Sequence, residues 1–176
     1  MESRAIIPVR GIHPHAPRDI PGTMPEAPDP STLPSALIDA ALWAQAFASC
    51  ALAGLIWFVQ VVHYPLLRQV GPDTFAAYHA AHTRRTTLVV APLMLAEAIA
   101  ALALVVASPG SATARTGLVL VALLWASTFF VQVPIHNRLA RGPHPADLTR
   151  LVRTNTLRTS LWTLRAVLAL WMLPPA

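Results

Sequence analysis

Long apolar runs constrain this chain more than any other feature of its sequence. They lie at about 40–62, 86–108, 116–135 and 159–174. A helix needs ~20 mostly apolar residues to cross a bilayer, and a buried helix of a soluble protein seldom stays apolar on every face for that length. The first run holds only Gln45 and Gln60 as strongly polar members, and the second only Glu97. The pattern predicts an all-α fold: an integral membrane four-helix bundle spanning 36–176.

Residues 1–35 have a different character, because they are rich in proline and show no apolar periodicity. A segment of this composition cannot bury enough apolar surface to offset the entropy of ordering it. We therefore predict a disordered proline-rich tail at 1–35, ahead of the transmembrane domain at 36–176.

The charges of the chain predict its orientation. The net charge is +5 at pH 7, yet only 12% of the residues are charged, against ~25% in soluble domains. A positive balance also occurs in nucleic-acid-binding proteins, but here arginines flank the apolar runs, so topology explains them and no nucleic acid is predicted. The connections after the first and third runs hold most of these arginines: Arg68, Arg84, Arg85, Arg138, Arg141, Arg150, Arg153 and Arg158. Positive-inside bias places both connections in the cytoplasm of a bacterial inner (plasma) membrane and both termini outside.

A short phrase recurs at the ends of two apolar runs and suggests an internal repeat. The two copies read Phe58-Val59-Gln60-Val61 and Phe130-Val131-Gln132-Val133, and a histidine follows each, His63 and His136. A similar displacement pairs Pro72 with Pro145. Two hairpins of equal orientation would be related by an axis along the membrane normal. We hold a duplicated helical hairpin as a hypothesis.

Histidines gather on the predicted cytoplasmic side. His63 and His136 end two spans, and His79 and His82 lie on the helix that leads into the second span. Neutral imidazole binds Fe, Cu and Zn well and suits proton transfer near neutral pH. In the alternative, each histidine is a polar anchor at the headgroup level, and the spacing matches no closed zinc pattern. Other polar residues are expected near this level: Gln60, Tyr78, Gln132, Asn137, Asn155 and Arg158.

Glu97 lies near the middle of the second apolar run. Ionisable residues inside a membrane are costly and are usually paired. Arg165 reaches a similar depth in the fourth run, which enters from the same side, so we predict a buried Glu97–Arg165 pair. The alternative makes Glu97 a proton carrier or metal ligand, and we expect it to meet Gln60 or Gln132 below the histidines.

Several of these motifs resemble those of a group of small bacterial four-span membrane proteins to which no function is assigned. The resemblance covers about residues 50–166 and rests on Trp57-Phe58-Val59-Gln60, His63-Tyr64-Pro65, Tyr78-His79, His82-Thr83-x-Arg85, Pro92-x-Met94-x-x-Glu97, Gln132-Val133-Pro134-x-His136, Leu151-Val152-x-Thr154-Asn155, Arg158-Thr159 and Trp162-Thr163. More distantly, the four-span plan and residues 133–139 resemble the anthrone oxygenase-like membrane family. That resemblance implies oxidation of a polycyclic phenolic substrate by molecular oxygen, and no substrate is carried over.

Two functions are compatible with these features. In the first, a redox metal (Fe or Cu) or haem binds His63, His79, His82 and His136, and the protein oxidises a hydrophobic small molecule. Tyr78, Glu97 and Arg158 would then serve as catalytic or orienting groups. In the second, the chain is a non-catalytic membrane protein, either a small transporter, a subunit or an assembly factor. The Glu97–Arg165 pair then holds its bundle together. Oligomeric state is left open.

Overall fold

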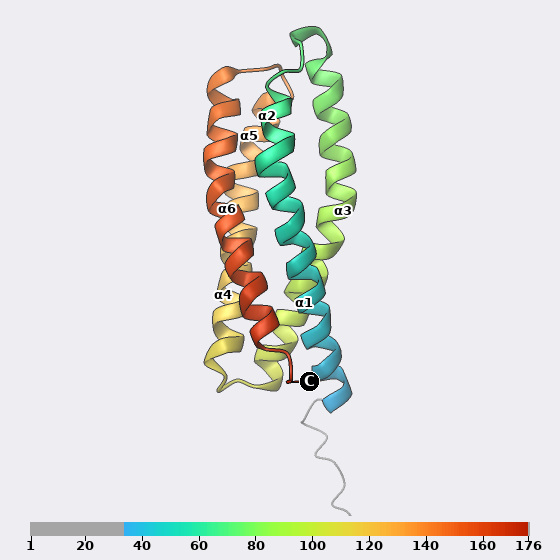
Figure 1. Ribbon diagram of the computed structural model, residues 1–176, viewed down its shortest axis with the longest axis vertical. Coiled ribbons are helices and arrows are strands. Elements are labelled where there is room, and N and C mark those ends of the chain that lie inside the picture. Colours follow the sequence, from blue (N-terminus) through green and yellow to red (C-terminus); the bar gives the residue numbers. More distant parts are fainter. Residues whose placement is uncertain (1–33, 176) are drawn as a thin grey trace, which may run out of the picture. The chain divides into compact units, whose positions relative to one another are not determined.

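The computed structural model describes residues 34–175, which form a bundle of helices (Figure 1). The elements are α1 (Ser35–Phe58), η1 (Val59–His63), α2 (Tyr64–Leu67), α3 (Pro72–Ala107), α4 (Ala112–Ser127), η2 (Thr128–Gln132), α5 (Val133–Leu139) and α6 (Pro145–Trp171), where η marks a π-helical segment. The segments α1, η1 and α2 continue one another, as do α4, η2 and α5. The described residues therefore form four long helices, which confirms the all-α four-helix prediction. The predicted tail lies outside the described residues except for its last two positions, and Ser35 already begins α1.

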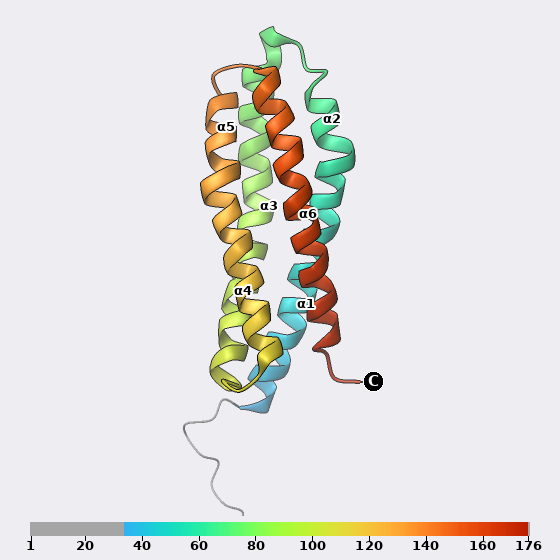
Figure 2. The ribbon, with the colours of Figure 1, turned by 90° about the vertical axis from the view of Figure 1, so that its left-hand side faces the viewer.

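Helices that follow one another along the chain lie side by side in this bundle. α1 packs against α3 and α6, and α4 packs against the same two helices, so α1 and α4 lie on a diagonal (Figures 1 and 2). The short 108–111 turn joins α3 to α4 and makes them antiparallel neighbours. The Ser111 side chain caps α4 by accepting a hydrogen bond from the backbone N–H of Ala114 at 3.2 Å.

Three prolines, Pro65, Pro92 and Pro134, lie inside the long helices, and a π-helical segment precedes the first and the last of them. Pro65 follows η1, and Pro134 follows η2. Proline has no N–H to donate to the carbonyl four residues back, and its ring clashes with that carbonyl. The wider π turn moves the carbonyl away and lets the helix continue. The first helix therefore continues past Pro65 to Leu67, beyond the predicted run at about 40–62, and the third continues past Pro134 to Leu139, beyond the run at 116–135.

Three helices of the described chain are long and apolar enough to cross a membrane. They span Ser35–Leu67, Pro72–Ala107 and Ala112–Leu139. The fourth predicted run, 159–174, falls largely within α6, which is not among them, because Arg165 interrupts the run and the part of α6 before it is rich in arginine and threonine. α6 turns this polar stripe inward, since its buried residues recur at helical spacing: Asn155, Arg158, Thr159, Trp162 and Arg165. Its exposed face is apolar along the second half, with Leu157, Leu164, Val167, Leu170 and Trp171.

The whole bundle, like α6, exposes apolar side chains and buries polar ones. Large apolar side chains lie on its outside, where Phe130 is 81% exposed and Trp171 is 83% exposed. The buried polar residues are Gln45, Ser49, His79, Glu97, Gln132, Asn155, Arg158, Thr159 and Arg165. Soluble proteins rarely expose so much contiguous apolar surface and seldom bury so many polar groups.

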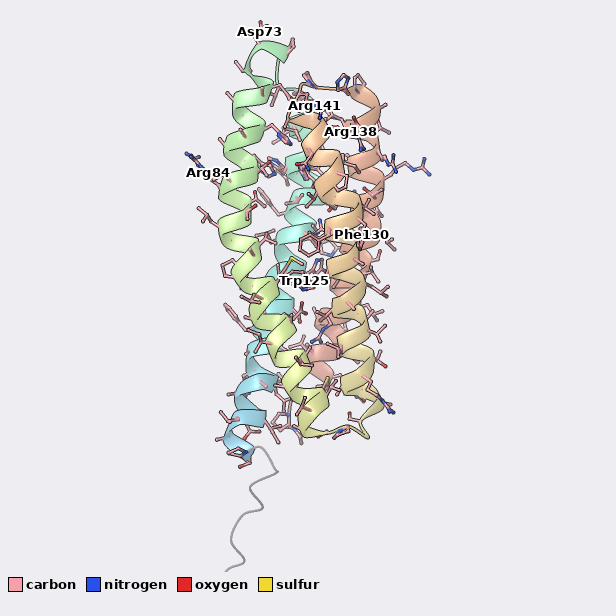
Figure 3. All side chains as sticks on the ribbon, turned by 180° about the vertical axis from the view of Figure 1, so that it is seen from behind. Asp73, Arg84, Trp125, Phe130, Arg138 and Arg141 are labelled. Carbon is pink, nitrogen blue, oxygen red and sulfur yellow. The ribbon has the colours of Figure 1, made fainter. Side chains whose placement is uncertain are left out.

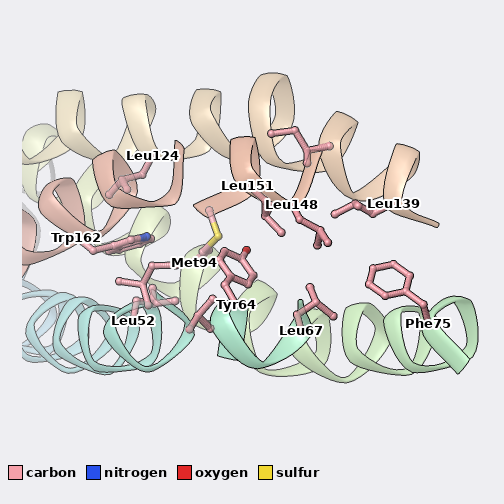
Figure 4. Close-up of a cluster of buried hydrophobic side chains, with 13 residues drawn as sticks. Leu52, Tyr64, Leu67, Phe75, Met94, Leu124, Leu139, Leu148, Leu151 and Trp162 are labelled. Atoms are coloured by element: carbon pink, nitrogen blue, oxygen red, sulfur yellow. The ribbon is translucent and has the colours of Figure 1, made fainter. Parts of the chain in front are cut away.

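A cluster of buried apolar side chains joins all four helices in the half of the bundle that holds α2 and α5 (Figure 4). Its members drawn and labelled include Leu52, Tyr64, Met94, Leu124 and Trp162. The same half carries arginines on its outside and in its connections, among them Arg84, Arg138 and Arg141 (Figure 3). Polar groups lie next to this core, and they form two separate layers.

Candidate functional site

The first polar layer is a buried ion pair between α3 and α6. Arg165 Nε lies 3.2 Å from Glu97 Oε1, and neither side chain is exposed. The same carboxylate oxygen accepts a hydrogen bond from Ser49 Oγ of α1 at 2.6 Å. The predicted Glu97–Arg165 pair is thus confirmed. The expectation that Glu97 meets Gln60 or Gln132 is wrong, because Ser49 and Arg165 surround the carboxylate instead.

Further residues complete this layer, and sequence reasoning did not find them. Arg165 Nη2 donates to Gln45 Oε1 at 2.7 Å, and Gln45 Nε2 donates to Met172 Sδ at 3.5 Å. On α4, Gly117 leaves room for the guanidinium: a Cβ at this position would lie 3.7 Å from Arg165 Cζ. A signal was present, because Gln45 and Ser49 are polar residues four positions apart within an apolar run and therefore share a helix face.

The second layer contains the four predicted histidines, which the fold brings together. His79 Nε2 of α3 and His136 Nδ1 of α5 lie 3.0 Å apart, so one ring donates a hydrogen bond to the other. Tyr64 Oη lies 3.5 Å from His136 Nε2. Because a neutral imidazole has one donor and one acceptor nitrogen, Tyr64, His136 and His79 form a continuous chain of hydrogen-bonding groups.

His63 and His82 form the other half of this histidine cluster. Their rings stack with centroids 3.9 Å apart and planes inclined by 18°. The ring of His82 is 6.3 Å from that of His136, which links the two halves, and His82 Nδ1 lies 3.2 Å from Thr86 Oγ1. Tyr78 stacks on His63 at 6.3 Å and is 43% exposed, so it forms the outer edge of the cluster.

A network of amides and hydroxyls lies beside the histidines. Asn155 Nδ2 donates to Gln60 Oε1 at 2.8 Å, and Asn155 Oδ1 accepts from Arg158 Nη1 at 3.3 Å. Arg158 Nη2 donates to Thr128 Oγ1 of η2 at 3.3 Å. Gln132 turns to a different partner, Thr154 Oγ1, at 3.0 Å. The two predicted glutamines therefore each hold α6, one from η1 and the other from η2.

A cavity of about 310 Å³ opens next to the cluster. One end is polar and is lined by Tyr64, His82, Gln132, His136, Asn137 and Arg158. The remaining lining is largely apolar and aromatic, and includes Leu52, Ile56, Val90, Met94, Trp125, Phe129 and Trp162. Thr87 and Ala91 of α3, Phe129 of η2 and Val133 of α5 line the cavity and are also exposed. The cavity therefore opens sideways, between α3 and the π-helical part of the third long helix.

The predicted site residues thus separate into three groups. The four histidines, Gln60, Gln132, Asn137, Asn155 and Arg158 lie at or near the cavity. Tyr78 lies outside its lining, and Glu97 and Arg165 form the other polar layer. Across residues 34–175, no three or more His, Cys, Asp or Glu side chains are already placed to hold a metal ion. Tyr64, Trp125 and Thr128 were missed, and of these only Tyr64 had a signal, its position directly after His63.

No family model, curated protein or solved structure matches this chain. The site is therefore interpreted from its own geometry.

Proposed function

We propose that this chain is a multi-pass membrane protein that takes a hydrophobic small molecule from the bilayer into its interior cavity and acts on it through the histidine cluster. The observation that carries the proposal is the position of the cavity. A single space, open sideways between two helices, is apolar along most of its length and ends at His82, His136 and Tyr64.

The membrane part of the proposal is supported by the distribution of polarity. Three helices have the length and composition of spans, and α6 buries its arginines while presenting an apolar face. Lipid suits such an exterior, and intramembrane charges face a bundle interior and pair there, as Arg165 does with Glu97. The arginines of the two long connections favour a plasma membrane location with those connections in the cytoplasm and both termini outside.

The lateral opening supports a hydrophobic ligand. The exposed residues of its lining are Thr87, Ala91, Phe129, Val133 and, at the polar end, Asn137. A molecule dissolved in the bilayer would enter there without crossing water. The volume of 310 Å³ lies at the small end of the ~300–1,000 Å³ typical of ligand sites, so the molecule is small.

The histidine cluster supplies the chemistry in this proposal. A hydrogen-bonded chain from Tyr64 through His136 to His79 can pass a proton along it, because each imidazole can exchange its donor and acceptor nitrogens. His136 is both a member of this chain and a lining residue of the cavity. Proton transfer to or from a bound molecule is the reaction type that this arrangement supports most directly.

A redox metal or haem, and with it an oxidoreductase, remains part of the proposal. The 3.0 Å between His79 Nε2 and His136 Nδ1 is close to the separation of two adjacent ligands on one ion, roughly 2.9–3.4 Å for bonds of ~2.0–2.1 Å. A third imidazole would come from His82 after a ring rotation, since it now stacks on His63. When bound, a redox metal would supply electron transfer to or from the molecule in the cavity.

The proposal is tested on the full chain purified in mild detergent from cells supplied with iron, copper and haem. We expect a lipophilic fluorescent dye to bind with a stoichiometry of about one, and binding to weaken when Ala91→Trp fills the rim. The control is Ala122→Trp, because Ala122 is exposed on α4 and does not line the cavity. Equal binding by both variants and the original chain would contradict the cavity as the binding site.

The metal part has its own readout. Metal binding would be supported by stoichiometric Fe or Cu, or by a visible absorption band, that is lost in His136→Gln and kept in His144→Gln. His144 serves as the control because it is exposed and lies outside the cluster. A colourless preparation without stoichiometric metal would remove the redox metal and leave proton transfer.

The second candidate function is a non-catalytic membrane protein, and one observation favours it. The layer of Gln45, Ser49, Glu97 and Arg165 connects three helices through hydrogen bonds and an ion pair between its own side chains, so it joins the bundle without any ligand. A chain that binds neither dye nor metal, but co-purifies with a fixed partner protein, would fit this function better.

The duplicated-hairpin hypothesis and the family resemblance belong to the same proposal. Pro72 and Pro145 each open a long helix, and η1 and η2 each precede a proline, which supports two related hairpins. The two π segments nevertheless begin at Val59 and Thr128, so they are not in the register of the repeated Phe-Val-Gln-Val phrase. The resemblance to oxidising membrane enzymes is consistent with a hydrophobic substrate.

A further inference from the structure

Arg158 is a buried guanidinium without an acidic partner. Only 7% of the residue is exposed, and it lines the polar end of the cavity. Its two hydrogen bonds, to Asn155 and Thr128, are both 3.3 Å long and go to neutral groups. Arginine stays protonated in proteins, so this end of the cavity holds a full positive charge.

The acidic residues of the described chain are all engaged or positioned elsewhere. Glu97 pairs with Arg165, and Asp147 pairs with Arg138 at 2.8 Å. Asp39 and Asp73 are exposed near the starts of α1 and α3. Within residues 34–175, therefore, no carboxylate neutralises Arg158. An interior charge in a membrane protein is normally paired, and an unpaired one marks a ligand or ion pathway.

Other hydrogen-bonding atoms at the cavity are also without a partner among the described residues. Arg158 Nε and Trp125 Nε1 are buried donors that make no hydrogen bond, and both residues line the cavity. Buried donors are almost always satisfied. The unused donor of Arg158 itself, together with its uncompensated positive charge, is what an anionic acceptor would satisfy.

From these observations we propose that the molecule bound in the cavity is a hydrophobic carboxylate, with its acid group on Arg158 and its apolar body along Trp162, Trp125 and Met94. This inference rests on the proposed function, because it names the class of molecule that the cavity takes. A carboxylate matches the planar fork of a guanidinium and neutralises its single charge. The other donor without a partner, Trp125 Nε1, belongs to the largely apolar part of the cavity lining.

Both the size and the charge of the cavity favour a free carboxylic acid over a phospholipid. A space of 310 Å³ is at the lower limit for ligand sites and would not enclose two acyl chains. Phosphate is commonly bound by several cations or by helix N-termini. Here one arginine faces the cavity, along with histidine, tyrosine and amide groups.

Dodecanoate and dodecanol form a matched pair of probes, because they share the chain and differ in the charge of the head. Binding of each is measured by competition with the lipophilic dye, using the full-length protein in mild detergent. We expect dodecanoate to compete at least tenfold more strongly than dodecanol. In Arg158→Met, the preference for dodecanoate over dodecanol should disappear while dodecanol competes as before. In Arg158→Lys, part of the preference for dodecanoate should remain, because the positive charge is kept.

Arg153→Met is the control, because Arg153 lies on the same helix and is exposed. It should keep the full preference, whereas an equal loss would indicate a general charge effect and overturn the inference. Equal competition by acid and alcohol on the unaltered protein would also overturn it, and that comparison needs no variant to fold. In that outcome the proposed function survives, since both probes still bind. If neither probe displaces the dye, the proposed function fails together with the inference.

Discussion

Glu97 and Arg165 form an ion pair across the interior of the bundle, 3.2 Å between Oε1 and Nε, with no part of either side chain exposed. The pair connects α3 to α6, and through Ser49 and Gln45 it also connects both helices to α1. The bundle therefore has one polar layer in which charge is balanced and another, at Arg158, in which it is not.

We predict that breaking the balanced layer destabilises the fold. Either Glu97→Gln or Arg165→Met leaves one charge buried without its partner, which costs about 3–5 kcal/mol in typical cases. The expected result is a clearly lower midpoint of thermal unfolding in detergent for each single variant. The double variant Glu97→Gln/Arg165→Met should lose less than the two single changes together, because no charge remains.

The matched control is Arg138→Met. It breaks an ion pair with Asp147 of similar length, but the side chain of Arg138 is 42% exposed, and such pairs contribute about 0–1 kcal/mol. A fall in midpoint as large as that of Arg165→Met would show that burial is not what makes the interior pair important.

Gly117 provides a second prediction about the same layer. A Cβ there would lie 3.7 Å from Arg165 Cζ and 3.8 Å from Leu168 Cδ2, which is ordinary contact, so Gly117→Ala should be tolerated. A larger side chain, as in Gly117→Leu, would push the guanidinium away from Glu97 and lower the unfolding midpoint. Gly54→Leu serves as the comparison, because nothing lies within 4 Å of that position and its midpoint should not fall.

The sequence predicts the parts of this structure that depend on helix length, chain direction and charge. Antiparallel neighbours and a rise of 1.5 Å per residue were enough to bring Glu97 to Arg165, and His63 and His82 to His136. The partners of Gln60 and Gln132 could not be predicted, because they depend on how each helix is rotated about its axis. That rotation changes at η1 and η2, and a π-helical turn leaves no mark on the apolar pattern of a run.

The cavity could not be predicted either. It is lined from all four long helices, and an apolar lining residue such as Met94 looks the same in a sequence as a fully packed one. Arg158 illustrates the limit: its residue type and depth were evident, whereas the absence of a carboxylate beside it is a property of the packed bundle.

We further predict that His79 and His136 are coupled in stability through the hydrogen bond between their rings. His79→Phe keeps the ring, which packs nearly parallel to Phe75 at 5.8 Å, but leaves His136 Nδ1 without its partner, a loss of about 1–3 kcal/mol. The double variant His79→Phe/His136→Phe removes both partners and should be no less stable than the single one. A thermal unfolding cycle measures this coupling. Additive losses would mean that the two rings do not share the hydrogen bond.

Cys50 tests the membrane location directly. It is the only cysteine of the chain and is exposed on α1, between Trp43 and Trp57, which are also exposed. A water-soluble maleimide reaches a thiol that faces water, whereas it does not reach a thiol that faces lipid. We predict no labelling of Cys50 by a water-soluble maleimide in membrane vesicles and full labelling after denaturation.

The same reagent tests the orientation when a single cysteine is placed at each end of the bundle in a Cys50→Ser background. Arg141→Cys lies in the connection between α5 and α6, and Ser108→Cys lies in the turn between α3 and α4. Because the arginine-rich connections are expected in the cytoplasm, Ser108→Cys should label in intact cells and Arg141→Cys only in inverted vesicles. The reverse result would invert the orientation.

Rapid labelling of Cys50 itself in intact vesicles would contradict the membrane proposal, because the exposed apolar face of α1 would then face water.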